Sequence, residues 1–279
     1  MKHAAGVVFL GLGLSLGLVG SLAFAANNST DMKPSFAQGD TLNVCTAGEF
    51  PPMEFYAKPG DARMVGFEVD VMQALARHWG VNLQLVVGDF KGLLPSLDSK
   101  RCDVVASGMT LTADRLKRYD GVGYFKSAKV MVTSTRGEPM RTPQDLSGKV
   151  IAIEAGTTYE GTVSALNKQL VESGRNPVSM QTYPSASAVI QQVLVGRAAA
   201  TITQDTTAAY RSSQLPGQLQ ITYTYPDAEL FGLYLRKDAA DLQKLKEALA
   251  ALQQSGELKT LLVKWNLPAM STDVQLAQQ

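Results

Sequence analysis

Short apolar runs alternate with helix-like repeats through the first half of the chain. The runs have the length of buried strands, and the repeats bring their apolar residues to one face at helical spacing. The predicted strands span residues 42–46, 83–87 and 104–106, and the predicted helices span 66–79, 93–100 and the segment that starts after Thr112. This order of strands and helices predicts a mostly parallel sheet.

The same order of elements returns after residue 149, without any repeat of the sequence itself. Predicted strands at 150–153 and 198–203 alternate with helices that end near residues 174, 195 and 213. Two longer extended runs, 129–135 and 219–235, stand on either side of this second unit and lack helical periodicity. Two further helices are predicted on either side of Gly256.

The N-terminal residues have the layout of a secretory signal. Lys2 precedes an apolar run over residues 4–22, and Ala23-Phe24-Ala25 supplies small residues for cleavage. An uncleaved membrane anchor is the alternative, because the run is nearly long enough to span a bilayer. We expect a signal peptide over residues 1–25, export to the periplasm, and a flexible leader over residues 26–39.

The composition argues against several classes of function. Loss of Lys2 lowers the number of basic residues from 26 to 25, which equals the 25 acidic residues, so no basic face for nucleic acid is expected. His78 is then the remaining histidine, which argues against a zinc site or a histidine-based catalytic triad. We predict no metal and no cofactor.

Cys45 and Cys102 are the two cysteines of the chain, and an exported protein allows them to form a disulfide. Cys45 lies late in one predicted strand, whereas Cys102 is expected to open another. In parallel neighbouring strands they would lie at different heights, and a bridge needs Cα atoms within about 7 Å. We therefore expect the two cysteines to remain unpaired.

Residues 107–115 combine small residues, hydroxyls and a cation. Thr112 is a predicted N-cap, so Arg115 would lie at the start of a helix, where free backbone N–H groups and a guanidinium can converge on one carboxylate. Gly108 would let a ligand approach the backbone, and Thr110 offers a hydroxyl. The alternative is that Arg115 only pairs with its neighbour Asp114.

In open parallel sheets, ligands bind beyond the carboxyl ends of the strands. The residues at those positions are Phe50, Phe90, Gly108, Thr110, Arg115, Glu154, Thr157, Thr158, Gln204 and Asp205. Together they suit a zwitterion, with Arg115 for a carboxylate and Asp205 for an ammonium, while the two aromatic rings enclose the rest of the ligand. Each residue taken singly also has a structural explanation as a cap or a core residue, but their shared position favours a ligand site.

Several motifs occur in order over residues 40–267. They are Glu49-Phe50-Pro51-Pro52-Met53-Glu54-Phe55, Gly66-Phe67-Glu68-Val69-Asp70, Asp89-Phe90-x-Gly92-Leu93-Leu94-Pro95-x-Leu97, Ser107-Gly108-Met109-Thr110-x-Thr112-x-x-Arg115, Gly156-Thr157-Thr158 and Gln204-Asp205. With these motifs the chain resembles the family 3 periplasmic solute-binding proteins of polar amino-acid ABC transporters.

The resemblance implies an α/β fold of the two-lobed periplasmic-binding-protein type (type II), in which two mostly parallel sheets flanked by helices are joined by two hinge strands. Lobe 1 is expected over residues 40–131 plus 227–267 and lobe 2 over 132–226, with a flexible tail over 268–279. By the family pattern, Arg115 binds the α-carboxylate with the amide of Thr158. Asp205, Gly108 and Thr110 bind the α-ammonium.

The resemblance also implies a function. A monomer that is not an enzyme would bind a free L-amino acid with a polar or cationic side chain by closure of the cleft, and would deliver it to an inner-membrane ABC permease. Two departures leave the ligand open: Ala47 stands where basic- and glutamine-binding members often carry an acid, and Glu154 stands where the glutamine binder has a lysine.

Glu154 bears on both the ligand and the alternative function. An ionised Glu154 facing the ligand needs a donor, which favours polar or cationic side chains, although Glu154 pointing to solvent or pairing with a lysine is also open. Cyclohexadienyl dehydratases resemble the same family and need a pocket acid, which Glu154 would supply. A clamp for both carboxylate and ammonium suits an amino acid better than prephenate, which has no amine.

Overall fold

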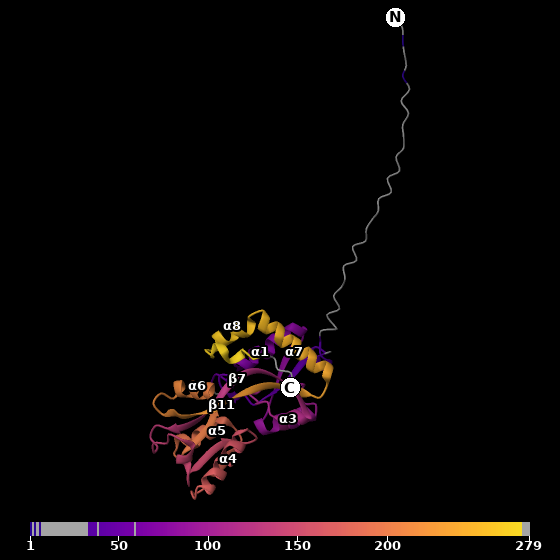
Figure 1. The fold of residues 1–279 in the computed structure, drawn as a ribbon. Coiled ribbons are helices and arrows are strands. Elements are labelled where there is room, and N and C mark those ends of the chain that lie inside the picture. Colours follow the sequence, from indigo (N-terminus) through magenta and orange to yellow (C-terminus); the bar gives the residue numbers. More distant parts are fainter. Residues whose placement is uncertain (2, 4–5, 7–32, 38, 59, 275–279) are drawn as a thin grey trace.

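The computed structural model describes residues 1, 3, 6, 33–37, 39–58 and 60–274 (Figure 1). The predicted signal peptide therefore lies outside the described residues, apart from three isolated positions. The strands are β1 (Thr41–Thr46), β2 (Glu49–Phe50), β3 (Glu54–Tyr56), β4 (Met64–Val65), β5 (Asn82–Val87), β6 (Val104–Val105), β7 (Tyr119–Ser134), β8 (Val150–Glu154), β9 (Ser179–Tyr183), β10 (Ala200–Gln204) and β11 (Leu219–Arg236). The helices are α1 (Phe67–Trp79), α2 (Leu93–Asp98), α3 (Ala113–Arg118), α4 (Tyr159–Glu172), α5 (Ala186–Leu194), α6 (Asp205–Gln214), α7 (Ala239–Gln254) and α8 (Glu257–Lys264). Within the described part of the chain, no helix has the length and apolar character needed to cross a membrane.

Two groups of parallel strands flank a central antiparallel pair. The strand order is β5-β1-β6-β11-β7-β10-β8-β9, with β1 parallel to β5 and β6, and β8 parallel to β9 and β10. The predicted parallel arrangement is thus confirmed within each group. Hydrogen bonding nevertheless runs through all eight strands, because β11 pairs with β6 of one group, β7 pairs with β10 of the other, and β7 and β11 pair with each other.

The central strands β7 and β11 connect two groups of helices. In Figure 1, α1, α7 and α8 lie on one side of the molecule and α4, α5 and α6 on the other, with β7 and β11 passing between them. The two strands pair from Arg236 with Tyr119 to Leu219 with Ser134, and the register shifts between Thr224 and Ala228. Pro226 lies within that shift, and it cannot donate a backbone hydrogen bond. We name the part that contains α1, α7 and α8 the first lobe and the part that contains α4, α5 and α6 the second lobe.

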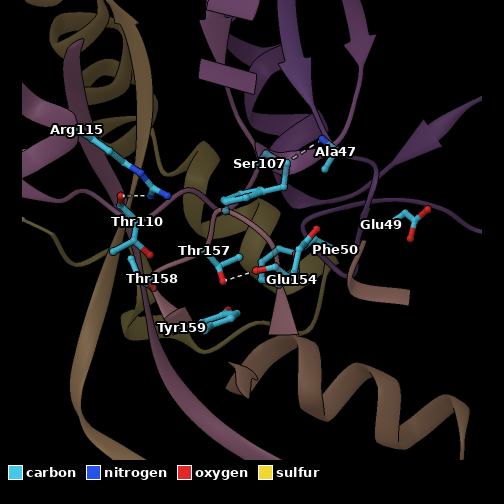
Figure 2. Close-up of a pocket in the computed structure, with 12 residues that line it drawn as sticks. Ala47, Glu49, Phe50, Ser107, Thr110, Arg115, Glu154, Thr157, Thr158 and Tyr159 are labelled. Atoms are coloured by element: carbon cyan, nitrogen blue, oxygen red, sulfur yellow. Dashed lines mark hydrogen bonds between the residues drawn. The ribbon is translucent and has the colours of Figure 1, made fainter. Parts of the chain in front are cut away.

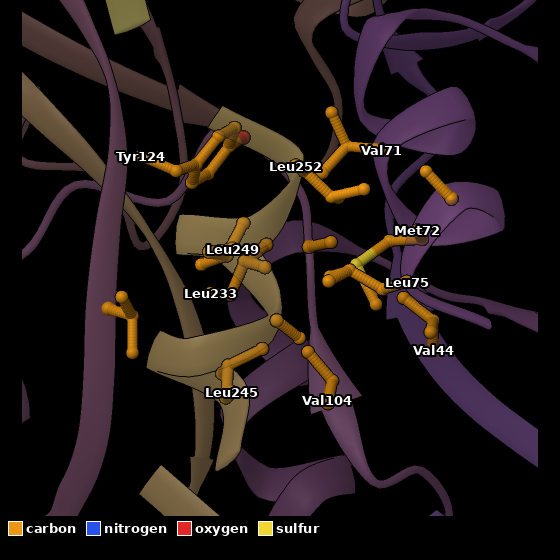
Figure 3. Packing of buried hydrophobic residues seen from close by; sticks show 14 of the residues in the cluster. Val44, Val71, Met72, Leu75, Val104, Tyr124, Leu233, Leu245, Leu249 and Leu252 are labelled. Carbon is orange, nitrogen blue, oxygen red and sulfur yellow. The ribbon is translucent and has the colours of Figure 1, made fainter. Parts of the chain in front are cut away.

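The first lobe has a core between α1, α7 and the sheet. Figure 3 shows α1 residues such as Met72 and Leu75 facing Leu245 and Leu249 of α7, with Val104 of β6 beside them. The period of the apolar residues in α1 explains this packing, because positions three and four apart lie on one helical face. The left-handed conformation of Gly80 ends α1 at the predicted position.

The second lobe is packed through two smaller clusters on either side of β8 and β10. Ile151, Ile153 and Ile202 pack against α4, while Ala152 packs with Val189 and Val193 of α5. Alternate residues of β8 thus point to opposite faces, and both faces are covered. The nearly continuous apolar run at 150–153 reflects this double burial.

The expectation of unpaired cysteines is wrong. Cys45 and Cys102 form a disulfide with their Cα atoms 5.6 Å apart. Cys102 does not open strand β6, because it lies in the preceding bend, which Asp103 ties to β1 by hydrogen bonds to the backbone N–H and side-chain amide of Asn43. The bend brings Cys102 next to Cys45, which is paired in register with Val105.

Other expectations also need correction. The leader is not wholly flexible, because Ser35–Ala37 form a 3-10 helix, Ala37 is fully buried, and Ser35 donates hydrogen bonds to Asp241. In the tail, Ala269–Thr272 form a 3-10 helix and Val274 is buried, whereas residues 275–279 lie outside the description. Strand β9 and the small sheet β2-β3-β4 were not predicted, since their short or polar segments carry no clear period of two.

Candidate functional site

A cavity lies between the two lobes, beyond the ends of the parallel strands. It has about 400 Å³ of space between its atoms, part of it open to solvent, and is lined by Ala47, Glu49, Phe50, Phe90, Ser107, Gly108, Thr110, Arg115, Glu154, Thr157, Thr158 and Tyr159. Eight of the predicted site residues are among them: Phe50, Phe90, Gly108, Thr110, Arg115, Glu154, Thr157 and Thr158. The fold thus brings strand-end residues from both halves of the chain to one place, and their contacts with a ligand remain a prediction.

Arg115 joins the two walls of the cavity. The Thr112 side chain caps α3 by accepting a hydrogen bond from the Arg115 backbone N–H at 3.3 Å, as the sequence predicted. The Arg115 guanidinium donates to the Thr110 carbonyl at 2.8 Å and, across the cavity, to the Gly156 carbonyl at 2.9 Å. Its alternative partner, Asp114, pairs with Lys117 instead at 2.7 Å. The guanidinium also lies 5.9 Å from the centre of the Phe90 ring, so it is held at the cavity wall.

The floor of the cavity is made by the loop after β6. Gly108 has a φ of +55°, and a Cβ added there would lie 2.5 Å from the Phe50 ring, so glycine is required for both conformation and space. The Gly108 N–H donates to the Glu68 carboxylate at 2.8 Å, and the Ser107 hydroxyl donates to Glu54 at 2.7 Å. Two buried acids therefore fix this loop from behind.

The two acids behind the floor share a low-dielectric site. Glu54 and Glu68 are at most 1 % exposed, and the Tyr124 hydroxyl donates a hydrogen bond to Glu68. Burial, reinforced by the neighbouring Glu68 charge, raises the pKa of the Glu54 carboxyl well above its ordinary value. Protonation of Glu54 avoids an unpaired buried charge in the core.

The side of the cavity away from Arg115 is acidic. In the view of Figure 2, Glu154 lies between Arg115 and Glu49. Burial, with repulsion from Glu49 and then Asp89, raises the pKa of the Glu154 carboxyl from 4.5 to about 8. One Glu49 carboxylate oxygen is buried without a hydrogen-bond partner among the described residues. This side of the cavity therefore favours a positive charge.

Glu229 is a residue that the sequence argument missed. It accepts hydrogen bonds from the hydroxyls of Thr110 at 3.2 Å and Thr158 at 2.8 Å, and it pairs with Lys129 at 3.4 Å. The buried Gln204 side chain also donates to it, at 2.6 Å. Glu229 lies within β11 and not at a strand end, so the strand-end rule could not find it. The polar interruption at Pro226-Asp227 is the one signal in the sequence that marks this part of the strand.

Gln204 and Asp205 do not line the cavity. Gln204 forms part of the wall behind Thr110 and Thr158 through its bond to Glu229. Asp205 begins α6, where its carboxylate accepts hydrogen bonds from the Ser127 hydroxyl at 2.6 Å and from the Thr206 N–H at 2.7 Å. Its predicted role as the acceptor for an ammonium is therefore not supported by its place in this structure.

Comparison with known proteins places the chain in a family. The profile of the bacterial extracellular solute-binding proteins, family 3, matches residues 42–268. The chain belongs to this family. The match covers both lobes and every residue that lines the cavity.

Relatives of this family 3 protein are named for amino acids. The L-cystine-binding protein TcyJ of Escherichia coli strain K12 is 32% identical over 228 residues, which cover 81% of this chain and 82% of the relative. The arginine-binding extracellular protein ArtP of Bacillus subtilis strain 168 is 29% identical, over 80% of this chain and 85% of the relative. The solved structure of an ancestral arginine-binding protein bound to arginine has a TM-score of 0.74 and 29% identity, over 81% of this chain and 98% of that one. These likenesses confirm the expected two-lobed α/β fold of the periplasmic binding proteins.

Within the described residues, no group of three or more His, Cys, Asp or Glu side chains is placed to hold a metal ion.

Proposed function

We propose that this family 3 protein binds a free L-amino acid with a polar or cationic side chain in the cavity between its lobes. As a monomer in the periplasm, after removal of residues 1–25, it delivers the ligand to an inner-membrane ABC permease. The observation that carries the proposal is Arg115, a guanidinium held at a helix start and joined to both lobes across the cavity. The relatives named for cystine and arginine support the ligand class.

The α-carboxylate of the ligand binds to Arg115 in this proposal. Arg115 contacts two backbone carbonyls in the present structure, and a carboxylate is the stronger partner for a guanidinium because it carries charge and accepts two parallel hydrogen bonds. The Thr158 backbone N–H, at the start of α4, is the second donor. Closure of the lobes is then stabilised by the ligand itself, because its carboxylate bridges groups from both.

The α-ammonium needs an acid close to the clamp, and Glu229 fits better than Asp205. Neither acid lines the cavity itself, but Glu229 bonds to Thr110 and Thr158, which do line it, whereas Asp205 is engaged with Ser127 and the start of α6. We therefore assign the ammonium to Glu229 and the Thr110 hydroxyl, in place of the family pattern. The variants Glu229→Gln and Asp205→Asn separate the two: the first should weaken amino acids but not their des-amino analogues, and the second should leave both unchanged.

The side chain of the ligand faces Glu154 and Glu49, with Phe50 and Phe90 enclosing its apolar part. A cation there relieves the mutual repulsion of the acids, whereas a carboxylate would add to it. Titration calorimetry of the purified chain lacking residues 1–25 tests this order of preference. Arginine, lysine, histidine, glutamine or cystine should bind, and aspartate and glutamate should not; absence of binding by any amino acid would overturn the proposal.

One observation favours a second function. The raised pKa keeps the buried Glu154 carboxyl protonated at neutral pH in the free protein, and a cyclohexadienyl dehydratase needs such an acid to protonate its leaving hydroxyl. Incubation with prephenate or arogenate tests it directly. Formation of phenylpyruvate or phenylalanine, lost in Glu154→Gln, would establish the enzyme, and no product with retained amino-acid binding would leave transport as the function.

A further inference from the structure

A second cavity continues from the candidate site into the second lobe. It has about 330 Å³ of space between its atoms, part of it open to solvent, and shares Phe50, Glu154 and Tyr159 with the first cavity. Its far wall carries Thr207 and Arg211 of α6, two polar residues that do not line the first cavity. A ligand that starts at Arg115 and extends past Glu154 would therefore reach these side chains.

Two buried polar atoms in this second cavity lack partners. The Thr207 hydroxyl, in a residue that is 2 % exposed, and the Arg211 Nε atom make no hydrogen bond to any described residue. An unpaired buried donor is destabilising, so an acceptor that enters the cavity would stabilise both groups. Thr207 and Arg211 are four residues apart on α6 and therefore lie on the same helical face, which suits an acceptor with two oxygens, such as a carboxylate.

Arg211 also closes the far end of the cavity. Its Nη2 atom donates to the Glu49 carbonyl at 3.2 Å, across the cleft, and to the Ser187 hydroxyl at 3.1 Å. Arg211 and Glu49 both line an outer groove beyond the inner cavity. The guanidinium thus lies between the inner space and solvent, with its Nε still available. Desolvation lowers the pKa of Arg211, and the Glu49 charge partly offsets this effect.

The charges follow an order along the joined cavities. Arg115 lines the first cavity only, Glu154 lines both, and Arg211 lines the second only. Glu49 lies beside Glu154 in the first cavity and contributes to its raised pKa. The joined cavities thus present a guanidinium, then two carboxyl groups, then a second guanidinium. This order is complementary to a molecule with a carboxylate at each end and an ammonium next to the distal carboxylate.

We infer that Thr207 and Arg211 form a second subsite for a distal carboxylate, with Glu154 and Glu49 facing the distal ammonium. The ligand class is then the α,α′-diamino dicarboxylic acids, such as L-cystine or diaminopimelic acid, in preference to amino acids with a single charged end group. This inference rests on the proposed function, because Arg115 must hold the first α-carboxylate. It adds a requirement that an arginine or lysine ligand does not meet.

The competing explanation is that Arg211 acts only as a latch that keeps the lobes closed through Glu49. A latch stabilises the closed form whatever the ligand, so its loss weakens all ligands by the same factor. A subsite discriminates, because its loss weakens only those ligands that carry the distal carboxylate. The two explanations therefore differ in a ratio of affinities and not in a single affinity.

Titration calorimetry with L-cystine, diaminopimelic acid, L-arginine and S-methyl-L-cysteine measures that ratio. For the unaltered chain, cystine should bind about 100-fold more tightly than S-methyl-L-cysteine, which lacks the second amino-acid group. Arg211→Gln should weaken cystine and diaminopimelic acid by about tenfold or more and should change arginine by less than about twofold. Thr207→Val should weaken the same two ligands by a smaller factor. Valine keeps the shape of threonine, so only one neutral hydrogen-bond donor is lost.

Controls separate folding from recognition. Arg175→Gln removes a charge from an exposed residue of the second lobe and should change no affinity, while Arg211→Lys keeps the charge and should retain part of the preference for cystine. Circular dichroism of each variant reports whether it folds.

Equal weakening of cystine and arginine binding in Arg211→Gln, or no weakening of either, would overturn the subsite. Tight arginine binding with weak cystine binding in the unaltered chain would overturn it while leaving amino-acid binding intact, and no binding of any ligand would overturn the proposed function itself.

Discussion

Both lobes line the cavity, the first with eight residues and the second with four, and the two lobes are held together differently. The first lobe contains the disulfide, the buried acids Glu54 and Glu68, and a large core that includes the rings of Trp79, Tyr124 and Phe231. The second lobe has two smaller and mainly aliphatic clusters and no cysteine. Its cavity residues Glu154, Thr157 and Thr158 lie between the end of β8 and the start of α4.

This difference separates two tasks. The loop that carries Gly108 and Arg115 is fixed from behind by buried carboxylates and a helix cap, so the first lobe presents a rigid clamp. Of the residues that we assign to ligand preference, Glu154, Thr207 and Arg211 belong to the second lobe, while Glu49 belongs to the first. A rigid clamp on one side and a variable wall on the other would let related proteins change their ligand without rebuilding the fold.

The largest expected effect comes from removal of the disulfide, which strengthens the first lobe alone. The cysteines are 57 residues apart, and the loss of such a crosslink lowers the free energy of unfolding by about 4 kcal/mol in the chain-entropy account. Both tryptophans, Trp79 and Trp265, lie in the first lobe, so their fluorescence follows that lobe during urea unfolding. In Cys45→Ala/Cys102→Ala the fluorescence transition should shift to lower urea, ahead of the circular dichroism transition of the remaining helices. Coincident transitions with an unchanged midpoint would show that the disulfide adds nothing to the first lobe.

The second effect concerns the clamp. Arg115→Ala should weaken every amino-acid ligand by about 3 kcal/mol, because the α-carboxylate common to all of them loses its charged partner. Calorimetry with arginine and with cystine measures it, and both should lose the same factor, in contrast with Arg211→Gln. Arg118→Ala, on the exposed end of α3, is the matched control. Unchanged affinity in Arg115→Ala would place the clamp elsewhere.

The third effect is a pH dependence located in the second lobe. The pKa of the Glu154 carboxyl is about 8 in the folded chain, against an ordinary value of 4.5. Between pH 4.5 and pH 8 the folded chain therefore keeps a proton that the unfolded chain has lost. The contribution to stability is complete below pH 4.5 and is lost as pH rises through 8, by up to about 1.4 kcal/mol per pH unit. Glu154→Gln should flatten the ligand-free stability curve between these limits, and saturating arginine should do the same in the unaltered chain. If the stability curves of the unaltered chain and of Glu154→Gln stay parallel from pH 5 to 8, the Glu154 carboxyl is not buried as it is in this structure.

The smallest effect compares one helix cap in each lobe. Thr112 caps α3 and Ser185 caps α5, each by accepting a backbone hydrogen bond at 3.3 Å. Thr112→Ala and Ser185→Ala should each lower the free energy of unfolding by about 1 kcal/mol. Only Thr112→Ala should also weaken ligand binding, because its cap bond goes to the backbone of Arg115. Equal losses of affinity in the two variants would mean that the clamp is no more sensitive than the rest of the fold.

Part of the site could be predicted because parallel strands end at one edge. Phe50, Phe90, Gly108, Arg115 and Glu154 each follow a predicted strand, and all of them line the cavity. Asp205 follows a strand too, but its carboxylate faces Ser127 and its own helix. Strand-end position fixes where a residue lies and leaves the direction of its side chain open.

Residues inside the long strands could not be predicted from strand-end positions. Only the last six residues of β7 were predicted, because Tyr119 to Ala128 mixes glycines with polar and aromatic residues and shows no clear period. Glu229 and Lys129 face each other only because β7 and β11 pair across a shifted register. Arg211 likewise carries no signal, since a lone arginine in a polar helix is typical of a solvated face.

The sequence by itself determined the elements with strong periodicity: the α1, α7 and α8 helices, the buried strands β1, β8 and β10, and the cap at Thr112. Their local spacing of apolar and capping residues decides their conformation. The tertiary structure alone decided the disulfide, the length of the hinge strands and the hydrogen-bonded group around Glu229. Each of these depends on the bend or register that brings distant segments together, and no local period records it.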